Sequence, residues 1–336
     1  MATSFCFLCI VVAAALIFDF VNGFHDAANV IATIVASRTL TPIQAVVLAS
    51  AANFVGYFTF GTAVAKMIGN GIVSLDSVTL MIVFTTLVGA TMWNLLTWLL
   101  GLPSSSSHAL IGGLLGSAVA ASGVKVVIFS GMIKIACFIF LAPLLGIFGS
   151  IALTVIAMLL NRNSNRKYAN NKFKFLQLLA ALLNSVGHGT NDAQKTMGII
   201  AIALLAAGVS ASFRIDGWVV FSCYAAISLG TLFGGWRIVK TMGLQITKIQ
   251  PLEGFSSGMS SATVLVGTAC FGIPVSTTHV IAGSIMGVGL VKSMKCVRWD
   301  TAQKMVFAWI MTIPIAACIS GIAYFSFSFV MQLTRS

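Results

Sequence analysis

Asn22-Gly23-Phe24-His25-Asp26-Ala27-Ala28-Asn29 is a polar stretch inside a long apolar run, and a related stretch, His188-Gly189-Thr190-Asn191-Asp192-Ala193-Gln194-Lys195, lies inside another. A shift of 166 positions places Gly23 on Gly189 and Asp26 on Asp192. A carboxylate at the centre of a hydrocarbon layer costs roughly 2.5–3.5 kcal/mol on insertion scales. Two such residues at matching positions indicate an ion-binding or chemical role and a duplicated chain.

The composition is that of a membrane protein. Of the 336 residues, 58% are hydrophobic and only 8% are charged, and the mean hydropathy is +1.02. A soluble domain carries about 25% charged residues. Apolar runs of helical rather than barrel-strand length recur, so we predict an all-α polytopic membrane protein. The net charge of +12 does not indicate nucleic-acid binding, because the basic residues lie in loops between apolar runs.

The runs divide the chain into two halves, residues 1–160 and 175–336, joined by a basic cytoplasmic linker at 161–174. We expect about ten transmembrane segments, five in each half, with some of them broken or re-entrant. The expected runs are 4–34, 43–65, 78–100, 109–122, 129–160, 175–208, 217–235, 258–271, 277–291 and 305–331.

The distribution of Lys and Arg predicts the orientation. With the N-terminus outside and one crossing at each run, thirteen of the 19 basic residues lie in cytoplasmic loops. Five lie outside, and Lys195 lies within the membrane. An odd number of spans in each half makes the halves antiparallel and places both termini outside the plasma (inner) membrane.

A second motif is also duplicated. Gly101-Leu102-Pro103-Ser104-Ser105-Ser106-Ser107-His108 matches Gly272-Ile273-Pro274-Val275-Ser276-Thr277-Thr278-His279 at an offset of 171. Pro followed by Ser and Thr favours a helix start whose free N–H groups and partial positive charge suit an oxyanion. Paired interrupted helices in inverted halves are typical of secondary transporters. We predict an anion site made by Ser105, Ser106, Ser107, Ser276, Thr277, Thr278 and Lys195.

The first motif supplies oxygen ligands for a hard cation or acceptors for a proton. The predicted coupling-cation residues are Asp26, Asn22, Asn29, Asn191, Asp192 and Gln194. The four histidines, His25, His108, His188 and His279, are candidates for a proton relay. Their spacing matches no zinc-ligand pattern, so Na⁺ is the one metal ion considered. Lys195 either contacts the anion or pairs with Asp192 three residues earlier.

Together these four motifs resemble the PiT inorganic phosphate transporter family, and the His25-Asp26 pair is closest to its bacterial low-affinity branch. The resemblance covers essentially the whole chain. It implies a plasma-membrane phosphate symporter built from inverted repeats, with the paired motifs lining the phosphate and cation site. Two departures concern the cation site. Many relatives have Asn-Asp in both copies, and many have a Glu shortly after the Gly-Phe that is Gly254-Phe255 here.

The predicted function is import of inorganic phosphate by alternating access, coupled to H⁺ or Na⁺, with no organic cofactor. Moving a dianion into a cell with an interior potential of −100 mV costs about 4.6 kcal/mol, which makes coupling to cations necessary. The alternatives are another tetrahedral oxyanion such as sulfate, a metal–phosphate complex, or an intramembrane hydrolase using Ser106 or Ser107 with His108. We do not expect an enzyme, and the oligomeric state stays open between a monomer and a homodimer.

Overall fold

The computed structural model describes residues 2–58 and 61–333, which are almost entirely helical. Within these ranges there is no β-strand beyond an isolated bridge between Val73 and Val127. The helices are α1 (Ala2–Ala36), α2 (Pro42–Val55), α3 (Ala63–Asn70), α4 (Leu80–Leu100), α5 (Ser106–Ser122), α6 (Phe129–Leu160), α7 (Arg166–Ala206), α8 (Gly217–Phe233), α9 (Trp236–Leu244), α10 (Pro251–Cys270), α11 (Thr277–Lys292) and α12 (Trp299–Leu333). Four single 3₁₀ turns, η1 (Gly56–Phe58), η2 (Leu75–Ser77), η3 (Val124–Val126) and η4 (Met294–Cys296), connect them.

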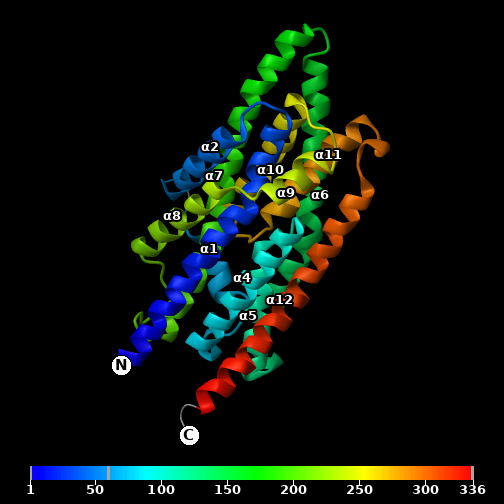
Figure 1. Cartoon of the computed structure of the whole chain (residues 1–336). Coiled ribbons are helices and arrows are strands. Elements are labelled where there is room, and N and C mark those ends of the chain that lie inside the picture. Colours follow the sequence, from blue (N-terminus) through cyan, green and yellow to red (C-terminus); the bar gives the residue numbers. More distant parts are fainter. Residues whose placement is uncertain (1, 59–60, 334–336) are drawn as a thin grey trace.

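The order of elements repeats. α1 and α7 contain the Asp motifs, α5 and α11 begin in the Ser/Thr motifs, and α6 and α12 are long helices with an internal proline at Pro143 and Pro314. Figure 1 shows α1 and α6 running in one direction and α7 and α12 in the other. The described ends of the chain lie at one end of the bundle, and the turn between α6 and α7 lies at the opposite end.

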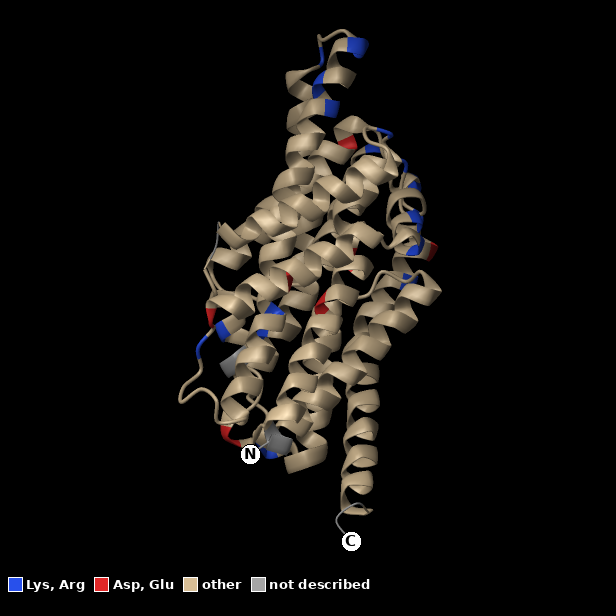
Figure 2. Ribbon diagram, turned by 60° about the vertical axis from the view of Figure 1, so that its left-hand side comes forward, with Lys and Arg blue, Asp and Glu red and all other residues tan. Residues whose placement is uncertain are grey.

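Polar residues fix where the helices begin. The Thr41 hydroxyl accepts a hydrogen bond from the Gln44 N–H, and the Gln44 side chain accepts one from the Thr41 N–H, so α2 starts with a capping box at Pro42. Asn165 caps α7 by accepting from the Lys167 N–H at 2.9 Å. Helix α7 therefore already begins at Arg166, and only 161–165 of the predicted linker form the turn. The turn between α6 and α7 forms one end of the bundle (Figure 1), and Figure 2 shows Lys and Arg at that end.

The short helices pack on the opposite half of the chain. α5 lies against α12, and α11 lies against α6, so each long final helix supports a half-helix from the other half. α1 packs between α8, α7 and α9, while α7 packs against α10, α2 and α3. This exchange interlocks the halves and brings the starts of α5 and α11 toward the middle of α1 and α7.

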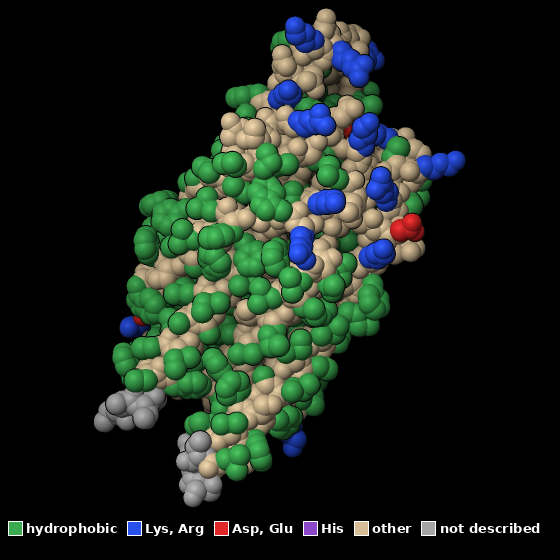
Figure 3. Space-filling view, in the orientation of Figure 1, with side chains coloured by type: hydrophobic (Ala, Val, Ile, Leu, Met, Phe, Trp, Pro, Cys, Tyr) green, Lys and Arg blue, Asp and Glu red, His purple; other side chains and the backbone are tan. Residues whose placement is uncertain are grey.

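The surface has the character expected of an integral membrane protein. Figure 3 shows hydrophobic side chains over the middle of the molecule and Lys and Arg gathered mainly at the end opposite the described chain ends. Figure 2 shows few charged residues within the bundle. The prediction of an all-α polytopic membrane protein is thus confirmed.

The predicted number of about ten segments is not confirmed by helix length and hydropathy. In the described chain, four stretches are long and apolar enough to cross a membrane: Phe5–Ala36, Leu80–Leu100, Phe129–Leu160 and Trp299–Leu333. The pair α8 and α9, bent by 72°, would be a fifth. The difference has a structural basis, because α5 and α11 contain only 17 and 16 residues and α7 carries its polar motif in its centre.

The motif glycines permit close helix packing around the centre. A Cβ on Gly23 would lie 2.2 Å from the backbone oxygen of Ile227 in α8, and one on Gly189 would lie 2.6 Å from the backbone oxygen of Asn53 in α2. Both distances are far below van der Waals contact, so α8 and α2 approach the two motif helices only because these positions lack side chains.

We expect Gly23→Ala to destabilise the protein by about 1–3 kcal/mol, because α1 and α8 must separate to admit the methyl group. The measurement is the thermal unfolding midpoint in detergent. Gly267→Ala in α10 is the matched control, since its Cβ would meet nothing within 4 Å. Equal midpoints for the two variants would contradict the packing argument.

Candidate functional site

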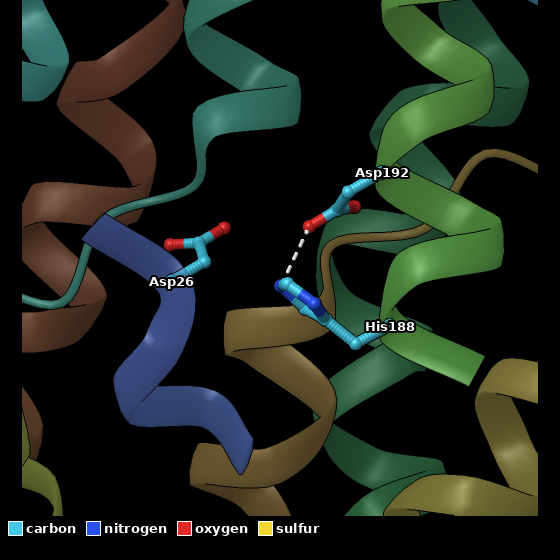
Figure 4. Close-up of side chains that lie close together, drawn as sticks. All are labelled: Asp26, His188 and Asp192. Atoms are coloured by element: carbon cyan, nitrogen blue, oxygen red, sulfur yellow. Dashed lines mark ion pairs between the residues drawn. The ribbon is translucent and has the colours of Figure 1, made fainter. Parts of the chain in front are cut away.

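The two motif aspartates meet in the centre of the molecule. Ligand atoms of Asp26 on α1 and of His188 and Asp192 on α7 all lie within 4.8 Å of one another (Figure 4). All three side chains are buried. Residues 166 positions apart in the sequence thus form one polar centre between the two halves.

Asp26 is held by groups from three helices. Its Oδ1 lies 2.7 Å from His25 Nδ1 and 3.5 Å from the Thr278 hydroxyl, and its Oδ2 accepts a hydrogen bond from the Ser106 hydroxyl at 2.8 Å. The other ring nitrogen of His25, Nε2, lies 3.0 Å from the Thr97 hydroxyl on α4. The carboxylate therefore contacts hydroxyls from the starts of both α5 and α11.

Asp192 has a fixed cationic partner. Lys195 Nζ lies 2.5 Å from Asp192 Oδ1, and the Thr277 hydroxyl donates to Oδ2 at 3.1 Å. His188 Nε2 lies 3.2 Å from the same Oδ2, the ion pair drawn in Figure 4, and His188 Nδ1 lies 3.4 Å from Asn53 Oδ1.

Lys195 uses all three of its donors in this structure. Besides Asp192, its ammonium donates to the Ser107 hydroxyl at the start of α5 and, at 2.9 Å, to the Val275 carbonyl before α11. Lys195 is almost completely buried. The pairing with Asp192 is thus present, and the same ammonium joins the Ser/Thr segments of both halves.

The starts of α5 and α11 are built alike. Ser105 caps α5 by accepting from the His108 N–H at 3.2 Å, and Ser276 caps α11 by accepting from the His279 N–H at 3.3 Å. The capping oxygens of these two residues are thus occupied, whereas Ser106, Ser107, Thr277 and Thr278 direct hydroxyls at the Asp and Lys side chains. Two helix N-termini, each with partial positive charge, face the centre.

The contacts follow the internal duplication. Ser106 binds Asp26 as its counterpart Thr277 binds Asp192. Across the halves, the Asn29 carboxamide donates to the Thr278 hydroxyl at 3.0 Å and to the Thr277 hydroxyl at 3.2 Å. Lys195, at the position equivalent to Asn29, contacts Ser107, which is equivalent to Thr278. The centre is therefore nearly two-fold in shape but asymmetric in charge.

Electrostatic repulsion within the centre is substantial. Two ionised carboxylates with oxygens within 4.8 Å repel by about 3.5 kcal/mol or more at an effective dielectric constant of 20. The Lys195 ammonium compensates one of the two charges. The remaining negative charge makes the centre suitable for a further cation or for protons on Asp26, His25 or His188.

Several predicted site residues have other partners. Gln194 Oε1 accepts from the Val64 and Ala65 N–H groups at 2.9 and 3.3 Å and so caps α3. The Asn191 amide donates to the Gly187 and Leu265 carbonyls. Buried carboxamide oxygens without a hydrogen-bond partner are found on Asn22, Asn29, Asn94, Asn184 and Asn191.

The histidines divide into two pairs. His25 and His188 contact the aspartates, whereas His108 and His279 stack on each other with ring centroids 4.8 Å apart. The His279 ring also lies 4.1 Å from the Trp309 ring. In the part of the chain described, no side-chain hydrogen bond connects His108 with Ser106 or Ser107, so the arrangement does not form a nucleophile–base pair.

Two polar residues near Asp26 were not among the predicted site residues. Thr97 on α4 binds His25, and the Ser104 hydroxyl donates to the Thr97 hydroxyl at 2.9 Å. Ser104 belongs to the Pro-Ser run and could have been included from that pattern. Thr97 lies outside both duplicated motifs in a run that contains several other threonines, and no sequence signal distinguishes it.

Comparisons with known proteins agree on one kind of protein. Residues 22–320 match the model of the phosphate transporter family. The chain is 47% identical to a "probable low-affinity inorganic phosphate transporter" of Rhizobium meliloti (94% of this chain, 95% of that protein) and 45% identical to one of Bacillus subtilis (94% and 96%). The fold matches a solved structure titled "The sodium-dependent phosphate transporter" with a TM-score of 0.87 at 24% identity, covering 97% of this chain and 100% of that one.

The Lys195–Asp192 pair generates a stability prediction. Lys195→Met removes the ammonium and leaves a buried carboxylate without its cation, which we expect to cost about 3–5 kcal/mol. Adding Asp192→Asn in the same chain should restore most of that loss. The measurement is unfolding in detergent for both single variants and the double variant, with Lys66→Met at an exposed position as control. Additive losses in the double variant would contradict the pairing.

Proposed function

The chain belongs to the phosphate transporter family, and on that premise we propose that it imports inorganic phosphate across the plasma membrane together with H⁺ or Na⁺. The observation that carries the proposal is the meeting of Asp26 and Asp192 with the starts of α5 and α11 in one buried centre. Hydroxyls suited to an anion and carboxylates suited to a cation are thereby in direct contact.

The starts of α5 and α11 are the proposed phosphate site. Backbone N–H groups and hydroxyls at a helix N-terminus favour an oxyanion. Ser106 and Thr277 now donate to carboxylates at 2.8 and 3.1 Å, and by rotation of the hydroxyls they can donate to a bound anion instead. Lys195 adds a positive charge shared between Asp192 and Ser107.

The neighbouring carboxylates favour phosphate over sulfate. Hydrogen phosphate and dihydrogen phosphate carry P–OH groups that can donate to Asp26 or Asp192, whereas sulfate near neutral pH has no donor to offer. A buried carboxylate facing sulfate would therefore meet only repulsion. A metal–phosphate complex remains a second form of cargo, because Asp26, His188 and Asp192 offer ligand atoms within 4.8 Å.

The coupling cation is proposed to bind beside the anion. The carboxamide oxygens of Asn22, Asn29 and Asn191 lack hydrogen-bond partners, and such oxygens with carboxylates suit Na⁺. The imidazoles of His25 and His188 beside the carboxylates suit protons instead. We favour the proton because the resemblance to the bacterial low-affinity branch points to it.

We propose alternating access between two antiparallel halves, 1–160 and 175–336. The packing of α5 on α12 and of α11 on α6 supports this, since movement of one half against the other would shift both helix starts together. The concentration of Lys and Arg at one end (Figure 3) supports an orientation with that end in the cytoplasm and the chain ends outside.

The chain is a transporter and not an enzyme, so the hydrolase alternative is excluded. The relatives at 45–47% identity are named as transporters. The contacts of His108 agree with this, because its ring stacks on His279 and, in the described chain, makes no hydrogen bond to Ser106 or Ser107.

We expect Asp26→Asn and Asp192→Asn each to lower radiolabelled phosphate uptake by about tenfold or more, since each removes one charge that a cation must neutralise. Uptake is measured in proteoliposomes containing equal amounts of folded protein.

The control for these variants is Asp216→Asn. Asp216 pairs with Arg214 at 3.1 Å at the partly exposed start of α8, away from the centre, and its loss should leave uptake unchanged. Wild-type uptake in both central variants would remove the basis of the proposed site.

The ion and the anion can be assigned in the same vesicles. We expect an inward pH gradient to drive phosphate accumulation without Na⁺, and equimolar sulfate to leave that accumulation unchanged. Sodium-driven accumulation without a pH gradient would assign Na⁺, and inhibition by sulfate would assign a broader oxyanion transporter.

A further inference from the structure

A third buried carboxyl lies near the centre. Asp19 on α1 is fully buried (0% exposed) and precedes Asp26 by seven residues, about 10 Å along the helix on the same face. Its Oδ1 accepts a hydrogen bond from the Thr196 hydroxyl on α7 at 2.9 Å, and its Oδ2 has no hydrogen-bond partner. Neither the duplicated motifs nor the proposed phosphate site includes this residue.

Asp19 differs from the other buried acids of the described chain in lacking a base. Asp26 lies 2.7 Å from a His25 nitrogen, Asp192 lies 2.5 Å from the Lys195 ammonium, and Glu253 lies 2.6 Å from the Lys292 ammonium. Asp19 has only neutral donors, the Thr196 hydroxyl and the Cys223 thiol. A carboxylate taken out of water without a cation is strongly disfavoured, so the side chain is held as the neutral acid.

Among the described residues, no unpaired cation lies near Asp19, because the Lys195 ammonium already pairs with Asp192. The Cys223 thiol and Tyr224 on α8 and the Asp192–Lys195 pair on α7 are the titratable groups near Asp19. α2 and α4, which also pack on α1, contain no titratable residue. α11 contacts α1 at Asp26 and Asn29, and α9 contacts it at Ala32 and Ala36. The one acid of α10, Glu253, already pairs with Lys292.

The site occurs in one half only. The residue equivalent to Asp19 at the offset of 166 is Ser185, whose hydroxyl donates to the Ala181 carbonyl of its own helix. Because the duplication supplies two Asp motifs but one Asp19, the second half offers no equivalent carboxyl. A single such group would account for one proton in each transport cycle.

We propose that Asp19 is a proton-binding site of this transporter, distinct from the paired aspartates, whose proton is taken up with the anion. The inference rests on the proposed phosphate import. Asp19 lies toward the N-terminal, outer side of Asp26, so its carboxylate takes a proton from water on that side. The O–H bond breaks on the cytoplasmic side, where water accepts the proton and Asp19 returns to the carboxylate.

The contact with Thr196 links this site to the centre. Thr196 follows Lys195 on α7, and Asp19 lies within electrostatic reach of both Lys195 and Asp192. Loss of the proton creates a carboxylate that competes with Asp192 for Lys195. Proton release therefore loosens the bond between the ammonium and the Asp192–Ser107 group that closes over the phosphate site.

The test compares driven transport with exchange in proteoliposomes. Asp19→Asn keeps the size and hydrogen bonding of the side chain but cannot release a proton. We expect it to lower pH-gradient-driven phosphate accumulation by about tenfold while phosphate counterflow at equal pH stays near the wild-type rate. Asp19→Glu should retain gradient-driven accumulation with a shifted pH profile, and Asp216→Asn should behave as wild type.

A second readout is independent of transport. Infrared spectra of the purified protein should contain the C=O stretching band of a protonated carboxylic acid, and Asp19→Asn should remove it. Accumulation by Asp19→Asn equal to wild type, or equal loss of counterflow and accumulation, overturns the proposal, as does a C=O band that the substitution leaves unchanged in intensity. Where Asp19→Asn does not fold, an unchanged pH profile in Asp19→Glu overturns it. Absence of phosphate counterflow in the wild type would refute the proposed function itself.

Discussion

Repulsion between two buried carboxylates is the constraint on which the structure depends. Asp26 and Asp192 are both buried, and each has a ligand atom within 4.8 Å of the His188 imidazole. The free-energy cost of burying these carboxylates is offset by their polar partners, which are Lys195, the hydroxyls of α5 and α11, and two histidines. Removing the break at the Pro-Ser/Thr segments would withdraw those hydroxyls. The interrupted helices and the buried acids therefore depend on each other, because each supplies hydrogen-bond partners that the other needs inside a membrane.

Inversion of the halves explains how a single centre receives both helix starts. Each half supplies an acid in the middle of a long helix and a Ser/Thr start from a short one, and the short helix packs on the other half. Equivalent contacts recur, with Ser106 on Asp26 and Thr277 on Asp192. The Asn29 and Lys195 positions break the equivalence, because a neutral amide faces α11 while an ammonium faces α5. The fixed positive charge of the centre therefore lies on the side of the second half, on α7.

The parts of this arrangement that could be predicted from the sequence are the motifs that occur in both halves of the chain. The duplicated Asp and Pro-Ser/Thr motifs were sufficient to predict that these residues lie together. Polar residues inside a membrane cost free energy, and their presence at matching positions in both halves indicates a shared site. Contacts that depend on the direction in which one side chain points could not be predicted from the sequence. Gln194 sits in the motif but caps α3, and Asn191 bonds to backbone carbonyls, since their helical phase turns them toward neighbouring helices. Asp19 and Thr97 belong to no repeat, and only the packing of α1 against α7 and α4 gives them partners. The linker was too polar to suggest a span, yet polarity does not prevent a capped helix from continuing past the membrane.

The charge of the centre accounts for why anion and cation would move together. With neutral histidines, two carboxylates and one ammonium leave one net negative charge in a medium where each unit charge pair at this spacing is worth about 3–4 kcal/mol. A phosphate dianion entering alone would raise that charge to three and would be rejected despite the two helix starts. A cation entering alone would neutralise the carboxylates but leave the hydroxyls and the ammonium bound as they are now, with no force to separate the halves. In the proposed transport, only the two together neutralise the acids and free Ser106 and Thr277 to donate to a new acceptor. In the proposed transport, the electrostatics of this centre would therefore favour the joint entry of anion and cation.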